Sequence, residues 1–551
     1  MARGELIRSR SLFDRIAGRV VLAAGWRRAL LAVLSGAFAT LALAPVDFPF
    51  AGFVAFPVLV WLIDGTGVDV EAGALRRSLR PFWTGWLFGF GYFVAGLWWL
   101  GAALLVDAGT FVWFLPLAVL GLPAVLAIFF GFAVALCRLV WSDSAWRILG
   151  LAACLGLAEW LRSWIFTGFP WNEIGVMAAS HPVLMQVVSL VGVHGLTILA
   201  VIVFSVPAIL LDNRGRWPML GLATVLLVGQ IGYGLWRLQD NPTFFDQTVV
   251  IQIVQPNIEQ SLKWDPEIAG QNFDTLIEMT TSKEASPGSP GGRAEGKASA
   301  PRRLIVWPET AVPFVLTDRP EAISRLAQSL SEGETLIAGA ARVDRSEAGR
   351  QRVYNTVYVI DDEGTIKAAS DKVHLVPFGE YLPFQDFLES LGVSSLVDMP
   401  GGFSAGPALE PVPLDGAPAF LPLICYEIIF PREVPVGDPV PGFILNVTND
   451  AWYGATPGPY QHVRMATVTA VALGLPMVRS ANTGISVVTD AVGREIGGLG
   501  LNRQGNLVSA LPANAMVTPY RTYRDLPFLL LLLTVSVIAL VMRFALRPGI
   551  G

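Results

Sequence analysis

The sequence predicts a polytopic α-helical membrane bundle, with about eight spans, that carries one inserted α/β domain. Hydrophobic residues make up 53% of the 551-residue chain and charged residues only 15%, and the mean hydropathy is +0.53. Soluble domains are about half apolar and about a quarter charged, so this composition favours a membrane protein. The net charge of -5 is small and no long basic stripe occurs, so a nucleic-acid partner is not expected.

Apolar runs long enough to cross a membrane occur along the first 240 residues and once near the end of the chain. A hydrocarbon core of ~30 Å needs about 20 apolar residues in a helix. We expect spans near residues 29–45, 49–64, 82–106, 111–140, 146–167, 183–211, 217–237 and 526–546. The chain would then consist of a bundle of about seven spans at 1–240, an inserted domain at 241–520, and a last span with a short tail at 521–551.

The placement of arginine predicts the orientation of these spans. Arginines gather at alternate ends of the runs, as at Arg27, Arg28, Arg76, Arg77, Arg80, Arg138, Arg147, Arg214, Arg216, Arg543 and Arg547. The intervening loops PVDFP and VDAGT contain no Lys or Arg. Because cytoplasmic loops are enriched in Lys and Arg, we expect both termini in the cytoplasm and residues 240–520 on the outer face. The N-terminus lacks a short apolar core with a cleavage site, so a removable signal peptide is not expected.

The region 245–515 has the pattern of an α/β domain. Short β-branched runs such as QTVVIQIVQ, RRLIVWPE and GFILNVTND are continuously apolar, as strands buried on both faces are. Helical stretches such as EAISRLAQSLSEG fall between them, which predicts a layered α/β fold. Residues 284–301 are rich in Gly, Pro, Ser and Ala and are expected to form a surface loop without chemistry.

Three polar residues stand in strand-like segments of this region: Glu309 and Cys425 follow apolar runs, and Lys372 precedes the string VHLVPFGEYLP. A carboxylate, an ammonium group and a thiol are the base, oxyanion partner and nucleophile that acyl transfer through a thioester needs. Each residue has a plainer alternative when taken alone, because the thiol could fill the core, the acid could be solvated in a loop, and the lysine could lie on the surface. Glu380 and Glu427 lie close to the lysine and the thiol in the sequence, where they could hold the lysine in place or satisfy a loop.

The ordered strings WPE, K-x-H-L-V-P-F-G-E-Y and C-Y-E closely resemble the carbon–nitrogen hydrolase, or nitrilase, superfamily. The flanking spans and the strings SLKWDP, YNT, NDAWYG, RSANTGIS and EWLRSWIFTGFPWN resemble one branch of it, the apolipoprotein N-acyltransferases of the bacterial inner membrane. The resemblance covers nearly the whole chain and implies an αββα sandwich. It implies catalytic roles for Glu309, Lys372 and Cys425, with Glu380, Tyr426 and Glu427 in support.

The function that the resemblance implies is a two-step acyl transfer. A fatty acyl chain of a membrane phospholipid, typically phosphatidylethanolamine, would move to the Cys425 thiol. The thioester would then acylate the α-amino group of the diacylglyceryl-cysteine of an apolipoprotein, giving a triacylated lipoprotein. No cofactor is implied, and no metal site is expected because the four histidines are scattered.

Aromatic loop residues are suited to excluding water from such a thioester. We expect substrate-binding or lid residues at Trp264, Asn355, Phe384, Trp452 and Tyr453, although ordinary aromatic core is the alternative for the aromatic ones. Two other functions remain open at this point. One is a membrane-tethered, nitrilase-like amidase that acts on a small amide. The other is a transporter or receptor that carries a catalytically inactive domain.

Overall fold

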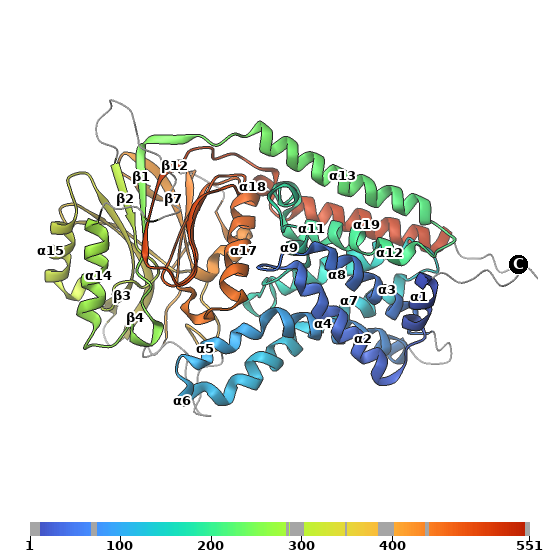
Figure 1. Ribbon diagram of the computed structural model, residues 1–551. Coiled ribbons are helices and arrows are strands. Elements are labelled where there is room, and N and C mark those ends of the chain that lie inside the picture. The colour runs from blue at the N-terminus through green and yellow to red at the C-terminus, as the bar shows by residue number, and fades with distance from the viewer. Residues whose placement is uncertain are drawn as a thin grey trace, which may run out of the picture. The chain divides into compact units, whose positions relative to one another are not determined.

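The computed structural model describes residues 12–67, 74–282, 286, 302–347, 350–383, 402–435 and 440–545. The chain divides into two compact units. The first unit comprises Met1–Trp98, Phe114–Trp236 and Tyr523–Gly551, and the second comprises Trp99–Trp113 and Arg237–Thr522. The first is helical and the second contains the strands (Figure 1). Of the predicted loop at 284–301, all but Ser286 lies outside the described residues.

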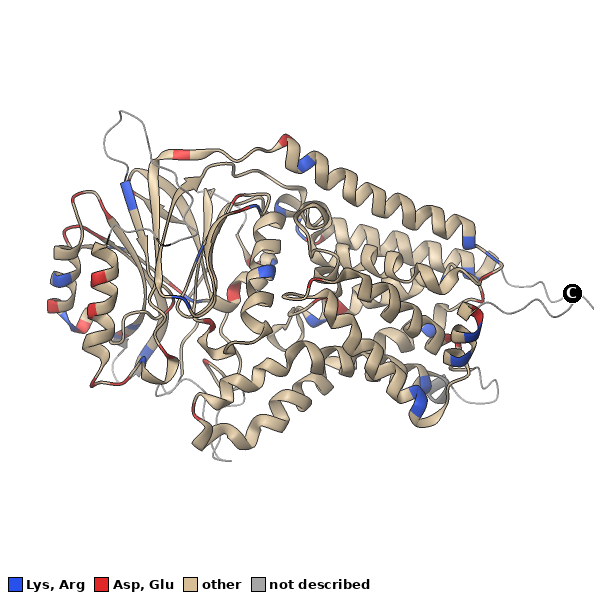
Figure 2. Cartoon of the chain, viewed as in Figure 1, with Lys and Arg blue, Asp and Glu red and all other residues tan. Residues whose placement is uncertain are grey.

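The first unit is built from helices that follow the predicted apolar runs. Its helices are α1 (Leu12–Val21), α2 (Gly25–Ala39), α3 (Gly52–Asp64), α4 (Ala74–Leu97), α7 (Leu122–Val140), α8 (Arg147–Arg162), α9 (Ile174–Met177), α10 (Pro182–Met185), α11 (Val188–Phe204), α12 (Val206–Ile209), most of α13 (Arg216–Asp240), and α19 (Leu526–Ala545). Figure 2 shows that charged residues lie mainly near the ends of the long helices, which leaves their middles apolar.

Within the described ranges, five helices are long and apolar enough to cross a membrane. They are Ser78–Leu105, Ala108–Val140, Val188–Ile209, Arg216–Asp240 and Leu526–Ala545. A sixth is obtained if Leu12–Val21 and Gly25–Ala42, which meet at a bend of 113°, form one span. The predicted membrane bundle is confirmed, but the count of eight is not. The predicted runs at 49–64 and 146–167 form only a shorter apolar helix and the 16-residue α8.

Helix α8 is short because polar side chains in its last turn fold back onto the chain that follows. Arg162 Nε donates to Glu159 Oε2 at 2.8 Å, and Arg162 Nη1 donates to the carbonyl of Trp171 at 3.0 Å. Both side chains are buried, so each charge is paired as burial in an apolar bundle requires. The pair therefore joins the last turn of α8 to the segment that follows it.

The second unit contains two six-stranded sheets. The first has the order β12-β1-β2-β3-β4-β5 and the second β11-β10-β9-β8-β7-β6. In each sheet three central strands are parallel and the flanking strands are antiparallel. The strands are β1 (Phe245–Gln255), β2 (Arg302–Val306), β3 (Thr335–Glu347), β4 (Arg350–Asp361), β5 (Ile366–Asp371), β6 (Val412–Leu414), β7 (Ala417–Ile424), β8 (Phe443–Thr448), β9 (Met477–Ala481), β10 (Ser486–Thr489), β11 (Glu495–Leu499) and β12 (Gly505–Pro512).

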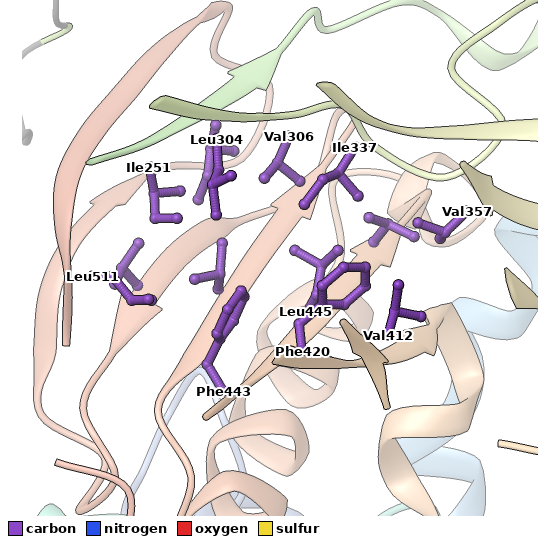
Figure 3. Packing of buried hydrophobic residues seen from close by; sticks show 14 of the residues in the cluster. Ile251, Leu304, Val306, Ile337, Val357, Val412, Phe420, Phe443, Leu445 and Leu511 are labelled. Atoms are coloured by element: carbon purple, nitrogen blue, oxygen red, sulfur yellow. The ribbon is translucent and has the colours of Figure 1, made fainter. Parts of the chain in front are cut away.

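The two sheets pack face to face over one apolar core (Figure 3). Side chains from β1, β2 and β3 of one sheet, such as Ile251, Val306 and Ile337, meet Phe420 and Leu445 from the other. Successive residues of a strand point to opposite faces, so the continuously apolar runs fill this core and also a second one beneath the helices.

Helices cover the outer faces of both sheets. Helices α14 (Ala269–Thr281) and α15 (Pro320–Ser329) pack on the first sheet through a second apolar cluster that includes Phe273 and Leu326. Helix α17 (Pro457–Leu473) lies on the side of the second sheet (Figure 1). The short helices α5 (Gly101–Leu105), α6 (Ala108–Phe111) and most of α18 (Pro519–Tyr523) complete the unit. The layers are therefore α, β, β, α, which confirms the predicted sandwich.

Candidate active site

Each of the three predicted catalytic residues follows the end of a strand in the second unit. Glu309 comes shortly after β2, Lys372 directly after β5, and Cys425 directly after β7. All three side chains are at most 8% exposed. Lys372 Nζ lies 3.5 Å from Glu309 Oε1, and the charges of both residues act on the pKa of the Cys425 thiol. The structure therefore brings the base, cation and thiol of the prediction into one buried site.

Two further side chains complete the surroundings of the Lys372 ammonium group. Glu380 Oε1 accepts a hydrogen bond from Lys372 Nζ at 2.9 Å. Asn355 Nδ2 donates to Glu309 Oε1 at 2.7 Å and lies 3.2 Å from Glu380 Oε1. Burial alone would lower the pKa of Lys372, but the carboxylates of Glu380 and Glu309 outweigh it and raise that pKa well above its ordinary value. Lys372 thus stays charged, and Asn355 lies between the two carboxylates.

The nucleophile candidate stands at a strained turn. Cys425 has a φ of +53°, a left-handed conformation that costs a residue with a side chain roughly 1–2 kcal/mol. The turn arises because strand β7 ends at Ile424 and the 3₁₀ helix Cys425–Ile429 begins at the next residue. Burial and the Glu309 carboxylate raise the pKa of the thiol to about 12, although Lys372 opposes them. At neutral pH the resting site therefore holds a protonated thiol.

Glu427 joins the segment after Lys372 to the turn at Cys425. Its Oε1 accepts from the backbone N–H groups of Val373 at 2.6 Å and His374 at 2.9 Å. Its Oε2 accepts from the N–H of Ile424 at 2.7 Å, directly before the thiol. Burial raises the pKa of Glu427 to about 7, against the lowering effect of Lys372 and these hydrogen bonds. Tyr426 is buried beside this link.

A second buried lysine, which is not among the predicted site residues, lies next to the proposed base. Lys263 Nζ donates to the backbone carbonyl of Glu309 at 3.0 Å and to Thr310 Oγ1 at 2.8 Å. Burial lowers the pKa of Lys263 to about 8, against the raising effect of the Glu309 charge. The string SLKWDP contained this residue, but only its tryptophan was selected as a site residue.

The predicted lid residues differ in their burial and in their contacts. Trp264 and Trp452 are half-buried, and Tyr453 packs edge-on against Trp99 with ring centroids 4.7 Å apart. Trp99 is buried, and its Nε1 donates to Gln461 Oε1 at 3.0 Å. Trp99 thus folds with the second unit, although it lies within an apolar run in the sequence. Phe384 lies outside the described residues.

Comparisons with known proteins match both parts of the chain. Residues 35–206 match the family model of the apolipoprotein N-acyltransferase N-terminal domain, and residues 251–520 match the carbon–nitrogen hydrolase model. The apolipoprotein N-acyltransferase of Brucella suis biovar 1 (strain 1330) is 51% identical over 506 residues, which cover 91% of this chain and 93% of that protein. That of Rhizobium rhizogenes (strain K84) is 48% identical over 534 residues, or 96% and 98% of the two chains.

A solved structure of an amidase from Nesterenkonia sp. is similar to this chain at a TM-score of 0.32 and 18% identity, over 51% of this chain and 95% of that one. The apolipoprotein N-acyltransferase relatives extend over both units of this chain. The chain therefore belongs to the apolipoprotein N-acyltransferase family, a group of acyltransferases within the carbon–nitrogen hydrolase superfamily.

Proposed function

We propose that this protein transfers a fatty acyl chain from a membrane phospholipid to the N-terminus of an apolipoprotein, through a thioester on Cys425. The observation that carries the proposal is the buried group of Glu309, Lys372 and Cys425, in a chain whose helical part and α/β domain both match family models. A free thiol with a base and a fixed cation beside it has the parts of a covalent acyl-transfer site.

In the first step, the Cys425 thiol attacks the ester carbonyl of the phospholipid. Because the pKa of the resting thiol is about 12, its proton must be removed during the attack, and Glu309, whose charge acts on that thiol, is the proposed base. Lys372 and the backbone N–H of Tyr426 would stabilise the oxyanion. A sulfur–carbon bond forms, the ester carbon–oxygen bond breaks, and lysophospholipid leaves with a proton.

In the second step, the α-amino group of a diacylglyceryl-cysteine attacks the thioester. Glu309 accepts the amine proton, the sulfur–carbon bond breaks, and the thiol is restored. The product is an amide, so the lipoprotein carries a third acyl chain. Trp264, Trp452 and Tyr453 are proposed to contact substrate or to exclude water, since water would convert the enzyme into a phospholipase.

We further propose phosphatidylethanolamine as the acyl donor and the bacterial inner membrane as the location. Residues 241–520 would form the catalytic domain on the periplasmic face, with both termini in the cytoplasm. The support for this orientation is the arginines at alternate helix ends, such as Arg80, Arg138, Arg216 and Arg543. Modification of single introduced cysteines by a membrane-impermeant reagent in whole cells tests it. Labelling near residue 545 in intact cells would refute it.

The function is tested by the intact mass of the purified protein after incubation with phosphatidylethanolamine. Wild type should gain one acyl mass that hydroxylamine removes, and Cys425→Ala should gain none. A diacylglyceryl-cysteinyl peptide should then discharge the adduct and appear as an amide. If no adduct forms and the phospholipid is neither consumed nor cleaved, the proposal fails. Ammonia release from small amides would then favour the amidase.

A further inference from the structure

A buried aspartate and a buried histidine adjoin the main chain of the nucleophile. His462 of α17 and Asp450, which follows β8, are both fully buried. His462 Nδ1 lies 2.9 Å from Asp450 Oδ1. The other ring nitrogen, Nε2, lies 3.2 Å from the backbone carbonyl oxygen of Cys425. The pair therefore ends on the main chain of the nucleophile rather than on its thiol.

The partners of the ring decide where its proton lies. A carbonyl oxygen only accepts, so Nε2 must carry a hydrogen and donate to Cys425. If the ring is neutral, Nδ1 is an acceptor, and Arg479 Nη2 at 3.1 Å is a donor to it. If the ring is charged, Nδ1 also carries a hydrogen and the Asp450 carboxylate accepts it. The hydrogen bond to the Cys425 carbonyl is therefore present in the charged ring and in the neutral ring that carries its hydrogen on Nε2.

Asp450 is itself held in place by buried donors. Arg479 Nη2 donates to Asp450 Oδ2 at 2.8 Å, and Thr448 Oγ1 donates to Asp450 Oδ1 at 3.0 Å. Burial would favour the neutral acid, but Arg479 and His462 lower the pKa of Asp450 to about 2. Asp450 is thus ionised at every working pH. Because Asp450, His462 and Arg479 are all buried and bonded to one another, these contacts can fix one orientation of the imidazole.

The carbonyl that accepts this hydrogen bond belongs to the peptide that joins Cys425 to Tyr426. The N–H at the other end of the same peptide is the proposed oxyanion donor. A hydrogen bond to the carbonyl of an amide polarises the amide and strengthens its N–H as a donor. It also holds the plane of a peptide whose first residue has the strained φ of +53°.

We propose that His462, oriented by Asp450 and Arg479, is a positioning residue that holds and polarises the Cys425–Tyr426 peptide for oxyanion stabilisation. The inference rests on the proposed acyl transfer through Cys425, but not on the identity of the acyl donor or acceptor. It assigns His462 to the rate of the acyl step, and neither to substrate binding nor to activation of the thiol.

The test uses an activated ester, p-nitrophenyl butyrate, and measures the first burst of p-nitrophenolate. In that burst the Cys425 sulfur–carbon bond forms, the ester carbon–oxygen bond breaks, and the thiol proton passes to Glu309. His462→Gln places an amide N–H₂ near Nε2 and keeps a donor to Cys425. His462→Asn reaches only the position of Nδ1 and keeps a donor to Asp450. The two variants therefore separate the two hydrogen bonds of the ring.

We expect the burst rate of His462→Asn to fall roughly 10- to 100-fold, which is somewhat less than the loss of rate when a whole oxyanion donor is removed. The burst rate of His462→Gln should stay within a few-fold of the wild-type rate. The KM for the ester and the rate of Cys425 alkylation by iodoacetamide, which forms no oxyanion, should change little in both. Thr469→Val is the matched control, because Thr469 Oγ1 donates from the same helix to Ile428 of the same turn at 2.7 Å. It should leave the burst unchanged.

The outcomes separate the possibilities. The inference is overturned if the burst rates of His462→Gln and His462→Asn are equal, or if His462→Gln is the slower of the two. It is also overturned if the burst rate and the alkylation rate fall by the same factor, or if wild type shows no burst. A normal wild-type burst with the expected order, but no reaction with phospholipid, would keep the inference and refute the proposed function. If His462→Asn does not fold, ¹⁵N NMR of wild type labelled at its four histidines decides. An Nε2 without hydrogen at His462 overturns the inference.

Discussion

Lys372→Met removes a cation that contacts two buried carboxylates, and the size of its effect can be worked out from the distances. Lys372 Nζ lies 2.9 Å from Glu380 Oε1 and 3.5 Å from Glu309 Oε1. At an effective dielectric constant of about 20, each contact corresponds to roughly 5 kcal/mol of attraction. Part of it offsets the desolvation of the ions, so removal of one partner is expected to destabilise the fold by about 3–5 kcal/mol.

The cost of Lys372→Met to the free energy of unfolding should depend on pH in a definite direction. The raised pKa of Lys372 means that its stabilising effect is fully present below about pH 10.5, so it is constant between pH 5 and pH 8 in wild type. In the variant, a buried carboxylate without its cation favours the protonated form. Protonation of this carboxylate costs less free energy at pH 5 than at pH 8. The difference in unfolding free energy between wild type and Lys372→Met should therefore grow as the pH rises.

The assay is denaturant unfolding in detergent at pH 5 and pH 8, with acyl-adduct formation measured in parallel. Loss of the cation near the oxyanion should slow adduct formation by about 10²–10³. Lys367→Met is the matched control, because Lys367 pairs with Asp361 at 3.2 Å but is 49% exposed. An exposed pair contributes about 0–1 kcal/mol. Equal stability of Lys372→Met and Lys367→Met, or a difference that shrinks as the pH rises, would refute the reasoning.

Three further changes test other parts of the site. Glu427→Gln should lower the unfolding free energy by about 1–3 kcal/mol, because the amide turns a donor toward a buried N–H such as that of Ile424; thermal unfolding measures it. Gly339→Ala should slow adduct formation, because a Cβ there would lie 2.4 Å from the Pro308 carbonyl and 2.7 Å from Glu309 Cα. Burial lowers the pKa of Lys263 to about 8, so between pH 8 and pH 10.5 only the unfolded chain holds the proton. Over this range the free energy of unfolding of wild type should rise by up to about 3 kcal/mol relative to that of Lys263→Met.

Matched controls accompany these three predictions. Glu433→Gln changes a half-buried carboxylate that faces His374 Nδ1 at 2.9 Å, and it should cost less than Glu427→Gln. Gly500→Ala adds a Cβ that meets nothing within 4 Å and should leave adduct formation unchanged. A Gly339→Ala enzyme as fast as Gly500→Ala would contradict the close approach at the base. A stability difference for Lys263→Met that stays flat above pH 8 would contradict its depressed pKa.

The local pattern of the sequence was sufficient for the class of the fold. Runs such as QTVVIQIVQ and GFILNVTND contain long apolar stretches. Such stretches are typical of strands covered on both faces, so the layered α/β domain could be predicted. Span limits were less certain, because hydropathy does not reveal where a helix stops. Helix α8 ends at Arg162, whose side chain contacts Glu159 and the carbonyl of Trp171. The contact with Trp171 depends on the path of the chain after the helix.

The sequence by itself was sufficient to select the three candidate site residues, because Glu309, Lys372 and Cys425 stand in strings whose residues and order are distinctive. The tertiary structure decided which other polar residues join them. Lys263 and His462 look like any surface lysine or scattered histidine, since no local pattern marks a polar side chain that will be buried. Their partners, the carbonyls of Glu309 and Cys425, come from distant segments that only the order of the strands brings together.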